Sequence, residues 1–389
     1  AMGAEQWARS NGRGAMGAEQ WARSNGRGAM APRYPEYCIC PIGVSPLLFC
    51  SPMSDHLRVE SIRGDLVESV HRVSVAVVDH AGRLVASAGA PDRVTFWRSA
   101  AKPFQAFPLV ADGAADRFGF DSRELALACA SHSSEPVHIQ VAESMLKKAE
   151  LGEQALACGP HPPLSSQVYE HALRHGLTIG PRWSNCSGKH VGMLALALAH
   201  DWPLAGYERA GHPVQQRILA EIERWTDVPA DQMRFGVDGC TVVCFGVPLR
   251  AMALAYARFA ASTDPAMARL RSAMAAHPGL IAGTGRICTD LNEATGGAIL
   301  AKVGADGIHC AAIPAAGLGV ALKVADGDMR SSGPALLAVL RQLADHGFVP
   351  LDLDQAPASL VRHVELPTVN TRGTVTGTLR ATGAVRFWD

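Results

Sequence analysis

The sequence lacks an excess of charge of either sign. Its 36 lysines and arginines balance 36 aspartates and glutamates, and no basic run appears. Without a positive field to hold nucleic acid or an anionic membrane, we expect neither as a partner. No apolar stretch approaches the length needed to cross a bilayer. The ten cysteines are scattered rather than densely spaced, which favours a reducing, cytoplasmic compartment over a disulfide scaffold.

The N-terminal residues lack the features of a folded domain. The first 28 residues are one 14-residue segment written twice, letter for letter, and fold repeats do not stay identical. An apolar run within residues 31–52 is interrupted by prolines and preceded by no lysine, which argues against an export signal. Met53 is a credible natural start. We therefore predict that residues 1–52 are a leader or tag-like segment and that residues 53–389 form the folded domain.

Strand-like segments lie near both ends of this domain; those near its start are rich in valine and serine with a period of two, and those near its end are short apolar runs between glycine-containing turns. These segments are residues 57–62, 67–79, 84–88, 298–303, 307–313 and 318–324. The last residues, 361–389, read as loop and a weak strand. Because helical patterns fill the middle, the sequence predicts an α+β fold. Its antiparallel sheet comes from both chain ends, about 55–98 and 296–389, and an all-helical lobe spans about 99–295.

Ser99 and Lys102 lie three residues apart in a segment predicted to be a helix ending near Gly113. On one helical face, a hydroxyl and an amine at this spacing can share a proton. The apolar neighbours Trp97 and Phe104 make burial of the amine plausible, and burial is what lowers a lysine pKa enough for it to act as a base. The spacing alone is weak, because Ser144 and Lys147 show it on a predicted solvated face.

Two further segments allow either a structural or a functional interpretation. The polar residues 131–134 precede a predicted helix at 136–150, so they cap that helix or line a site. Lys302 lies inside an apolar strand, where its amine points out from the sheet edge or is buried in the site. A glycine-rich loop at 283–286 lacks the lysine and hydroxyl of a phosphate loop, so we expect it to shape a pocket.

A third polar cluster occupies residues 183–190, just before an apolar helix. Helix N-termini favour anions and thiolates, so Cys186 there is a candidate for reactivity or metal binding. Asp238 and Cys240 follow in a tight glycine turn. The structural alternative is a capped core helix with buried, inert cysteines.

Several blocks together resemble the rhizobial-type (class 3) L-asparaginases. The resemblance runs from about Arg63 to Asp389, and the fold of that family is similar to that of serine β-lactamases and their glutaminase relatives. The blocks are RSAAKP at 98–103, CASHSSE at 129–135, SNCSGKHVGML at 184–194, VDGC at 237–240 and the lysine within AILAKVGADG at 298–307. No single block is specific, but their order and combination are.

The resemblance implies an amidohydrolase that converts asparagine to aspartate and ammonia through a serine acyl-enzyme. It implies two pairs, Ser99 with Lys102 and Ser131 with Lys302, of which Ser99 is expected to be the nucleophile. A homodimer is also implied. The other implied residues are zinc ligands at Cys186, Lys189 and Cys240, and substrate-binding residues at Arg98, His138, His190 and Asp238. By charge, Arg98 suits the carboxylate of a free amino acid and Asp238 its ammonium group.

Two alternatives remain open. The same apparatus would serve another serine amidase, such as a glutaminase or a β-lactam or peptide hydrolase. The chain could also be a non-catalytic zinc-binding protein whose serines merely cap helices.

Overall fold

The computed structural model describes residues 56–388, which belong to one compact unit. The predicted leader and the start at Met53 lie outside the described residues. Within the described residues, no helix is both long and apolar enough to cross a bilayer. All seven cysteines of this part of the chain are free thiols.

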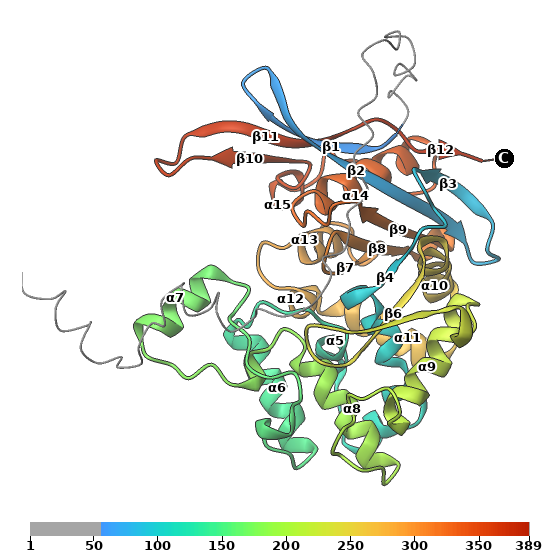
Figure 1. The fold of residues 1–389 in the computed structure, drawn as a ribbon, viewed down its shortest axis with the longest axis vertical. Coiled ribbons are helices and arrows are strands. Elements are labelled where there is room, and N and C mark those ends of the chain that lie inside the picture. Colours follow the sequence, from blue (N-terminus) through green and yellow to red (C-terminus); the bar gives the residue numbers. More distant parts are fainter. Residues whose placement is uncertain (1–55, 389) are drawn as a thin grey trace, which may run out of the picture. The chain divides into compact units, whose positions relative to one another are not determined.

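A large antiparallel sheet combines strands from both ends of the described chain (Figure 1). Its order is β10-β11-β1-β2-β9-β8-β7, while β3 pairs with both β2 and β12. The strands are β1 Arg58–Arg63, β2 Leu66–Asp79, β3 Leu84–Ala88, β7 Leu300–Val303, β8 Ile308–Ile313, β9 Leu318–Val324, β10 Glu365–Val369, β11 Val375–Thr382 and β12 Arg386–Phe387. The predicted α+β class, with an antiparallel sheet built from both ends, is therefore confirmed.

The C-terminal tail contributes more to this sheet than its sequence indicates. It was predicted as loop with a weak strand, yet β11 pairs with β1 over six residue pairs and β10 pairs with β11. The short, polar-rich strands carry little periodic signal of their own. Their pairing with β1 supplies what local propensity does not.

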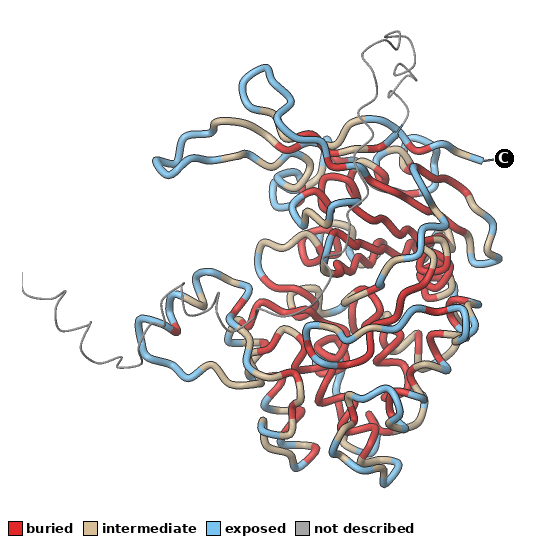
Figure 2. Tube along the Cα trace, viewed as in Figure 1, coloured by how far each residue is buried: buried red, intermediate tan, exposed pale blue. Residues whose placement is uncertain are grey.

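Two helices cover the central strands. The strands β7, β8 and β9 are buried along their whole length (Figure 2). The helices α10 (Leu249–Ala261) and α14 (Ser332–Asp345) pack against β8 and β9, and α13 (Ile287–Ala294) packs against β7. Gly319 lets α10 approach closely, since a Cβ there would lie 2.0 Å from the carbonyl oxygen of Ala253. Lys302 therefore lies in a strand that is buried on both faces and not exposed to solvent.

The middle of the chain is mostly helical. Its helices are α2 Lys102–Gln105, α3 Phe107–Ala111, α4 Ala114–Arg117, α5 Ser122–Ala128, α6 Pro136–Lys148, α7 Ser166–Arg174, α8 Ser187–Ala199, α9 Pro213–Thr226, α11 Pro265–Ala276, α12 Pro278–Ile281 and α13 Ile287–Ala294; α15 Ala358–Val361 follows near the C-terminus. The prediction of an all-helical lobe is wrong at one place. A second sheet, with the order β4-β6-β5, lies there and consists of β4 Val94–Phe96, β5 Arg234–Val237 and β6 Val243–Pro248.

The helix predicted from Ser99 to about Gly113 is interrupted. A 3₁₀ turn at Arg98–Ala101 leads into α2 and then α3, each with a proline in its first turn. Proline lacks the N–H that would continue a helical hydrogen-bond series, so each proline begins a new short helix. Ser99 lies inside the 3₁₀ turn and does not cap a helix.

Candidate active site

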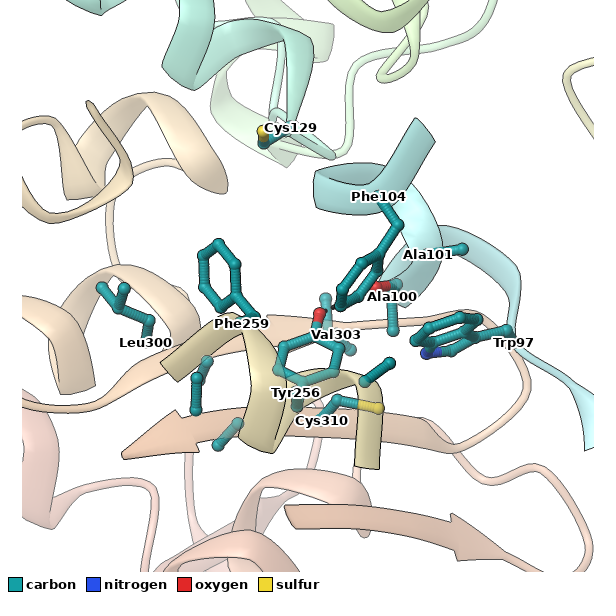
Figure 3. Packing of buried hydrophobic residues seen from close by; sticks show 14 of the residues in the cluster. Trp97, Ala100, Ala101, Phe104, Cys129, Tyr256, Phe259, Leu300, Val303 and Cys310 are labelled. Carbon is teal, nitrogen blue, oxygen red and sulfur yellow. Dashed lines mark hydrogen bonds between the residues drawn. The ribbon is translucent and has the colours of Figure 1, made fainter. Parts of the chain in front are cut away.

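An aromatic cluster supports the turn that carries Lys102. The ring centroids of Trp97 and Phe104 lie 4.9 Å apart, and those of Phe104 and Tyr256 lie 5.5 Å apart (Figure 3). The Tyr256 hydroxyl donates a 2.7 Å hydrogen bond to the carbonyl of Ala100. Lys102 is fully buried, as the apolar neighbours predicted.

The amine of Lys102 points to the loop that carries Ser131. It donates to the carbonyl of Ala130 at 2.5 Å, to Ser131 Oγ at 3.0 Å and to the carbonyl of Asn185 at 3.3 Å. Three acceptors match the three N–H groups of an ammonium ion. Lys102 therefore joins the Ser131 loop to the loop before α8.

Lys302 approaches the same hydroxyl from β7. Its Nζ lies 2.8 Å from Ser131 Oγ and 2.9 Å from the carbonyl oxygen of Val303. The side chain is fully buried. Burial, reinforced by the charge of Lys102, lowers the pKa of Lys302 to about 7. An amine with this pKa is about half neutral at pH 7 and mostly neutral by about pH 8, so it can accept a proton.

Ser99 occupies a different place from the one its spacing indicated. The backbone N–H of Lys102 donates to the carbonyl of Ser99, but no hydrogen bond joins the two side chains in the described structure. The expected contact between Ser99 Oγ and Lys102 is therefore wrong for this conformation. Ser131 instead has both lysines, and the role of Ser99 in catalysis remains a prediction.

Backbone contacts fix the Ser131 loop. Ser131 donates its N–H to the carbonyl of Ile281 at 2.9 Å, and His132 donates to the carbonyl of Asn185 at 3.3 Å. Arg286 Nη1 donates to the carbonyl of Ser131 at 2.5 Å. The glycine-rich loop 283–286 was predicted to shape a pocket, but the sequence did not indicate that its arginine would hold the backbone of Ser131.

The three predicted zinc ligands come together and are all buried. Lys189 Nζ donates to Cys240 Sγ at 3.1 Å. A hydrogen bond from the Cys240 thiol lowers the pKa of Cys186 well below its usual value despite burial, and the same bond raises the pKa of Cys240. Burial would lower the pKa of Lys189, but the two neighbouring sulfurs raise it.

This donor set fits a zinc ion in its chemistry. Two thiols and one amine, with water as a fourth ligand, make up a set that zinc accepts, provided the amine loses its proton. Among residues 56–388, no three His, Cys, Asp or Glu side chains form a metal-binding group, so a site here depends on the lysine. His190 Nε2 is buried beside this cluster and has no hydrogen-bond partner among the described residues.

Arg98 and Asp238, predicted to bind opposite ends of an amino acid, are joined to each other. Arg98 Nε donates to Asp238 Oδ1 at 2.9 Å, and Arg98 Nη1 also contacts the carboxylate of Asp306. Burial raises the pKa of Asp238, but the charges of Lys189 and Arg98 outweigh it and hold that pKa below its usual value. The guanidinium of Arg98 thus already faces two carboxylates.

The two predicted substrate-binding histidines differ in their surroundings. Both ring nitrogens of His138 contact backbone: Nδ1 accepts from the N–H of Glu135, and Nε2 lies 2.9 Å from the carbonyl of Gly279. His190 uses only Nδ1, which lies 2.6 Å from the Tyr207 hydroxyl. His190 therefore keeps one ring nitrogen for another partner, whereas His138 is engaged in the protein.

Comparisons with known proteins identify a family for this arrangement. The family model L-asparaginase II matches residues 59–381, which is most of the chain. A search of curated proteins found no match.

Solved structures give weaker likenesses. Mglu in its native form in the presence of 4.3 M NaCl is 20% identical, covering 72% of this chain and 62% of that one, with a TM-score of 0.33. A proposed beta-lactamase from Bacteroides dorei DSM 17855 is 13% identical, covering 69% of this chain and 84% of that one, with a TM-score of 0.31. This chain spans less than two thirds of the length of the first structure.

Proposed function

The chain belongs to the L-asparaginase II family and is an amidohydrolase, and we propose that it hydrolyses L-asparagine through a serine acyl-enzyme. One observation carries the proposal. Ser131 Oγ lies between two buried lysine amines, at 2.8 Å from Lys302 and 3.0 Å from Lys102. A hydroxyl in this position can lose its proton to one amine while the other stabilises the negative charge.

Lys302 is the better base of the two. It contacts one carbonyl besides Ser131, which leaves room for a lone pair, and its pKa is about 7. Lys102 donates to two carbonyls besides Ser131, so its N–H groups are already directed at acceptors. Lys302 would therefore take the proton of Ser131, and the ammonium group of Lys102 would stabilise the oxygen as its charge develops.

The reaction then proceeds in two halves. The Ser131 oxygen attacks the side-chain amide carbon of asparagine, and the tetrahedral adduct collapses as Lys302 returns its proton to the leaving nitrogen. Ammonia departs and an aspartyl ester remains. Water, deprotonated by the same amine, hydrolyses the ester to aspartate and restores the hydroxyl. Ser99 is the second candidate for the attacking serine, because the family resemblance assigns the nucleophile to that position.

We also propose that Cys186, Lys189 and Cys240 bind a zinc ion. When bound, it would polarise or position an oxygen of the substrate. These three side chains would hold the ion, while the described proton transfers remain with Ser131 and the lysines. Arg98, Asp238, His138 and His190 remain predicted residues of the surrounding substrate pocket, and the homodimer remains a prediction from the family.

The test is ammonia release from L-asparagine by the wild type, Ser131→Ala and Ser99→Ala. Loss of the attacking hydroxyl in Ser131→Ala should lower kcat by at least about 10³-fold. Ser144→Ala is the matched control, because Ser144 has the same spacing to a lysine but donates to Glu124 instead. Undiminished activity in both Ser131→Ala and Ser99→Ala would rule out serine chemistry.

The choice of substrate needs its own comparison. Rates with L-asparagine, L-glutamine and a chromogenic β-lactam separate an asparaginase from the other serine amidases. Faster turnover of either of the latter two would replace asparagine as the proposed substrate. No turnover of any amide, with zinc retained, would instead favour a zinc-binding protein.

A further inference from the structure

Arg286 is a cation without a counter-ion, next to the proposed nucleophile. Its Nη1 donates only to neutral carbonyls, those of Ser131 at 2.5 Å and Ala282 at 3.2 Å. No carboxylate in the described residues lies within ion-pair distance of it. The carboxylate of nearby Glu135 is occupied by the N–H and hydroxyl of Thr284, at 2.8 and 3.1 Å.

The electrostatics of Arg286 differ from those of a paired arginine. Burial lowers the pKa of Arg286 below its usual value. By contrast, Asp112 and Glu221 raise the pKa of Arg217, which bonds to both. Arg286 is partly buried, and a cation that loses part of its hydration without an anionic partner carries an unfavourable desolvation cost. An anion at Arg286 would offset that cost.

Arg286 also lines a cavity whose lining residues contact Ser131 and Lys302. The cavity has a volume of about 240 Å³ and is lined in part by Arg286, Cys288, Val303 and His363. Two of these lining residues contact the reacting residues: the carbonyl of Val303 accepts from Lys302, and Arg286 donates to the carbonyl of Ser131. This volume suits a ligand of amino-acid size rather than a peptide.

No carboxylate is among the residues that line this cavity. Its other basic side chains are already paired, Arg330 with Asp328 and His363 with Asp290. The uncompensated charge of the cavity therefore belongs to Arg286. The Arg98 group has the opposite balance, since one guanidinium there faces the two carboxylates of Asp238 and Asp306.

We infer that Arg286, rather than Arg98, binds the α-carboxylate of the amino-acid substrate; this rests on the proposed asparaginase function. A guanidinium can hold a carboxylate with two parallel hydrogen bonds, and Arg286 has N–H groups beyond the one used on Ser131. A carboxylate held here would share Arg286 with the carbonyl of Ser131, which accepts from Nη1. Arg286 would thereby select free amino acids over amides that lack the carboxylate.

The experiment compares three amides. L-asparagine carries both the ammonium and the carboxylate group, 3-aminopropanamide lacks the carboxylate, and succinamate lacks the ammonium group. In Arg286→Gln, kcat/KM for L-asparagine and succinamate should fall about 10- to 100-fold, the loss for a hydrogen-bonded charge pair. For 3-aminopropanamide it should change less than about threefold. Arg286→Lys should recover part of the loss, since lysine keeps the positive charge but cannot donate two parallel hydrogen bonds to a carboxylate.

The comparison separates binding from support of the loop. If Arg286 had a purely structural role, its replacement would lower kcat/KM by the same factor for all three amides, because Arg286 would then act only through the backbone of Ser131. Where 3-aminopropanamide is turned over too slowly, its inhibition constant against asparagine in the wild type and in Arg286→Gln reports the effect on binding, and this constant should change less than about threefold. Equal losses for all three amides, or a selective loss in Arg98→Gln but not in Arg286→Gln, would overturn the assignment. Absence of wild-type activity on asparagine would instead refute the proposed function.

Discussion

Replacing Lys302 by methionine should remove activity and at the same time stabilise the protein. Lys302 is fully buried, and its folded-state pKa is about 7 against an ordinary value of 10.5 for lysine. Below pH 7 the folded and unfolded states both hold the proton, and the whole desolvation cost is present. Between pH 7 and 10.5 the unfolded state binds more protons, so wild-type stability should rise with pH in this window.

The magnitude follows from the shift. The folded-state pKa of about 7 and the ordinary value of 10.5 differ by roughly 3.5, which at about 1.36 kcal/mol per pKa unit gives a cost of ~5 kcal/mol well below pH 7. At pH 7, where half of the folded protein already holds a neutral amine, the cost is ~4 kcal/mol. Methionine has a similar length and no charge, so Lys302→Met removes this cost. It also leaves the carbonyl of Val303 and Ser131 Oγ with one partner fewer, which costs about 1–3 kcal/mol. We expect a net stabilisation of a few kcal/mol at pH 7.

Urea unfolding at pH 7 and pH 9 measures this balance. The advantage of Lys302→Met should shrink by about 2 kcal/mol at pH 9, where wild-type lysine no longer carries its full desolvation cost. Ammonia release should fall by about 10² to 10⁴-fold, the usual range for a lost general base. Wild-type kcat/KM should decrease about tenfold per pH unit below pH 7, because protonated Lys302 cannot accept a proton. A variant less stable than the wild type at pH 7, together with a flat pH profile from 5.5 to 8.5, would refute the reasoning.

Two further predictions concern the metal and the helix that leads to Ser131. Cys240→Ser should lose the zinc measured by metal analysis after purification, because a hydroxyl is a much poorer zinc ligand than a thiolate; unchanged zinc content would contradict the proposed ligands. Asp121→Ala should lower the free energy of unfolding by about 1 kcal/mol, because Asp121 Oδ1 accepts from the N–H groups of Arg123 and Glu124 at 2.8 and 3.0 Å to cap α5. Thermal unfolding measures this loss, and a kcat that falls with it would show that the cap also positions the catalytic loop.

The sequence was sufficient for the features that depend on local pattern. The strand-like segments of the sequence located β2, β3, β8 and β9. Predictions from local sequence were wrong where strand pairing or a proline determined the secondary structure. The tail strands β10 and β11 depend on β1 for their hydrogen bonds, and the helix after Ser99 is divided by prolines.

Spacing along the chain identified the reactive residue types but not their partners. A serine three residues before Lys102 suggested the pair, whereas the tertiary structure directs that amine to Ser131, 29 residues away in sequence. The sequence left open whether Lys302 faces solvent, and in the folded chain it is fully buried in β7, which packs against α13. Its lowered pKa is a consequence of that burial. The sequence thus determined the fold class and the set of reactive side chains, and only the tertiary structure decided which of them touch and which charges remain unpaired, because burial and distance depend on segments far apart in the chain.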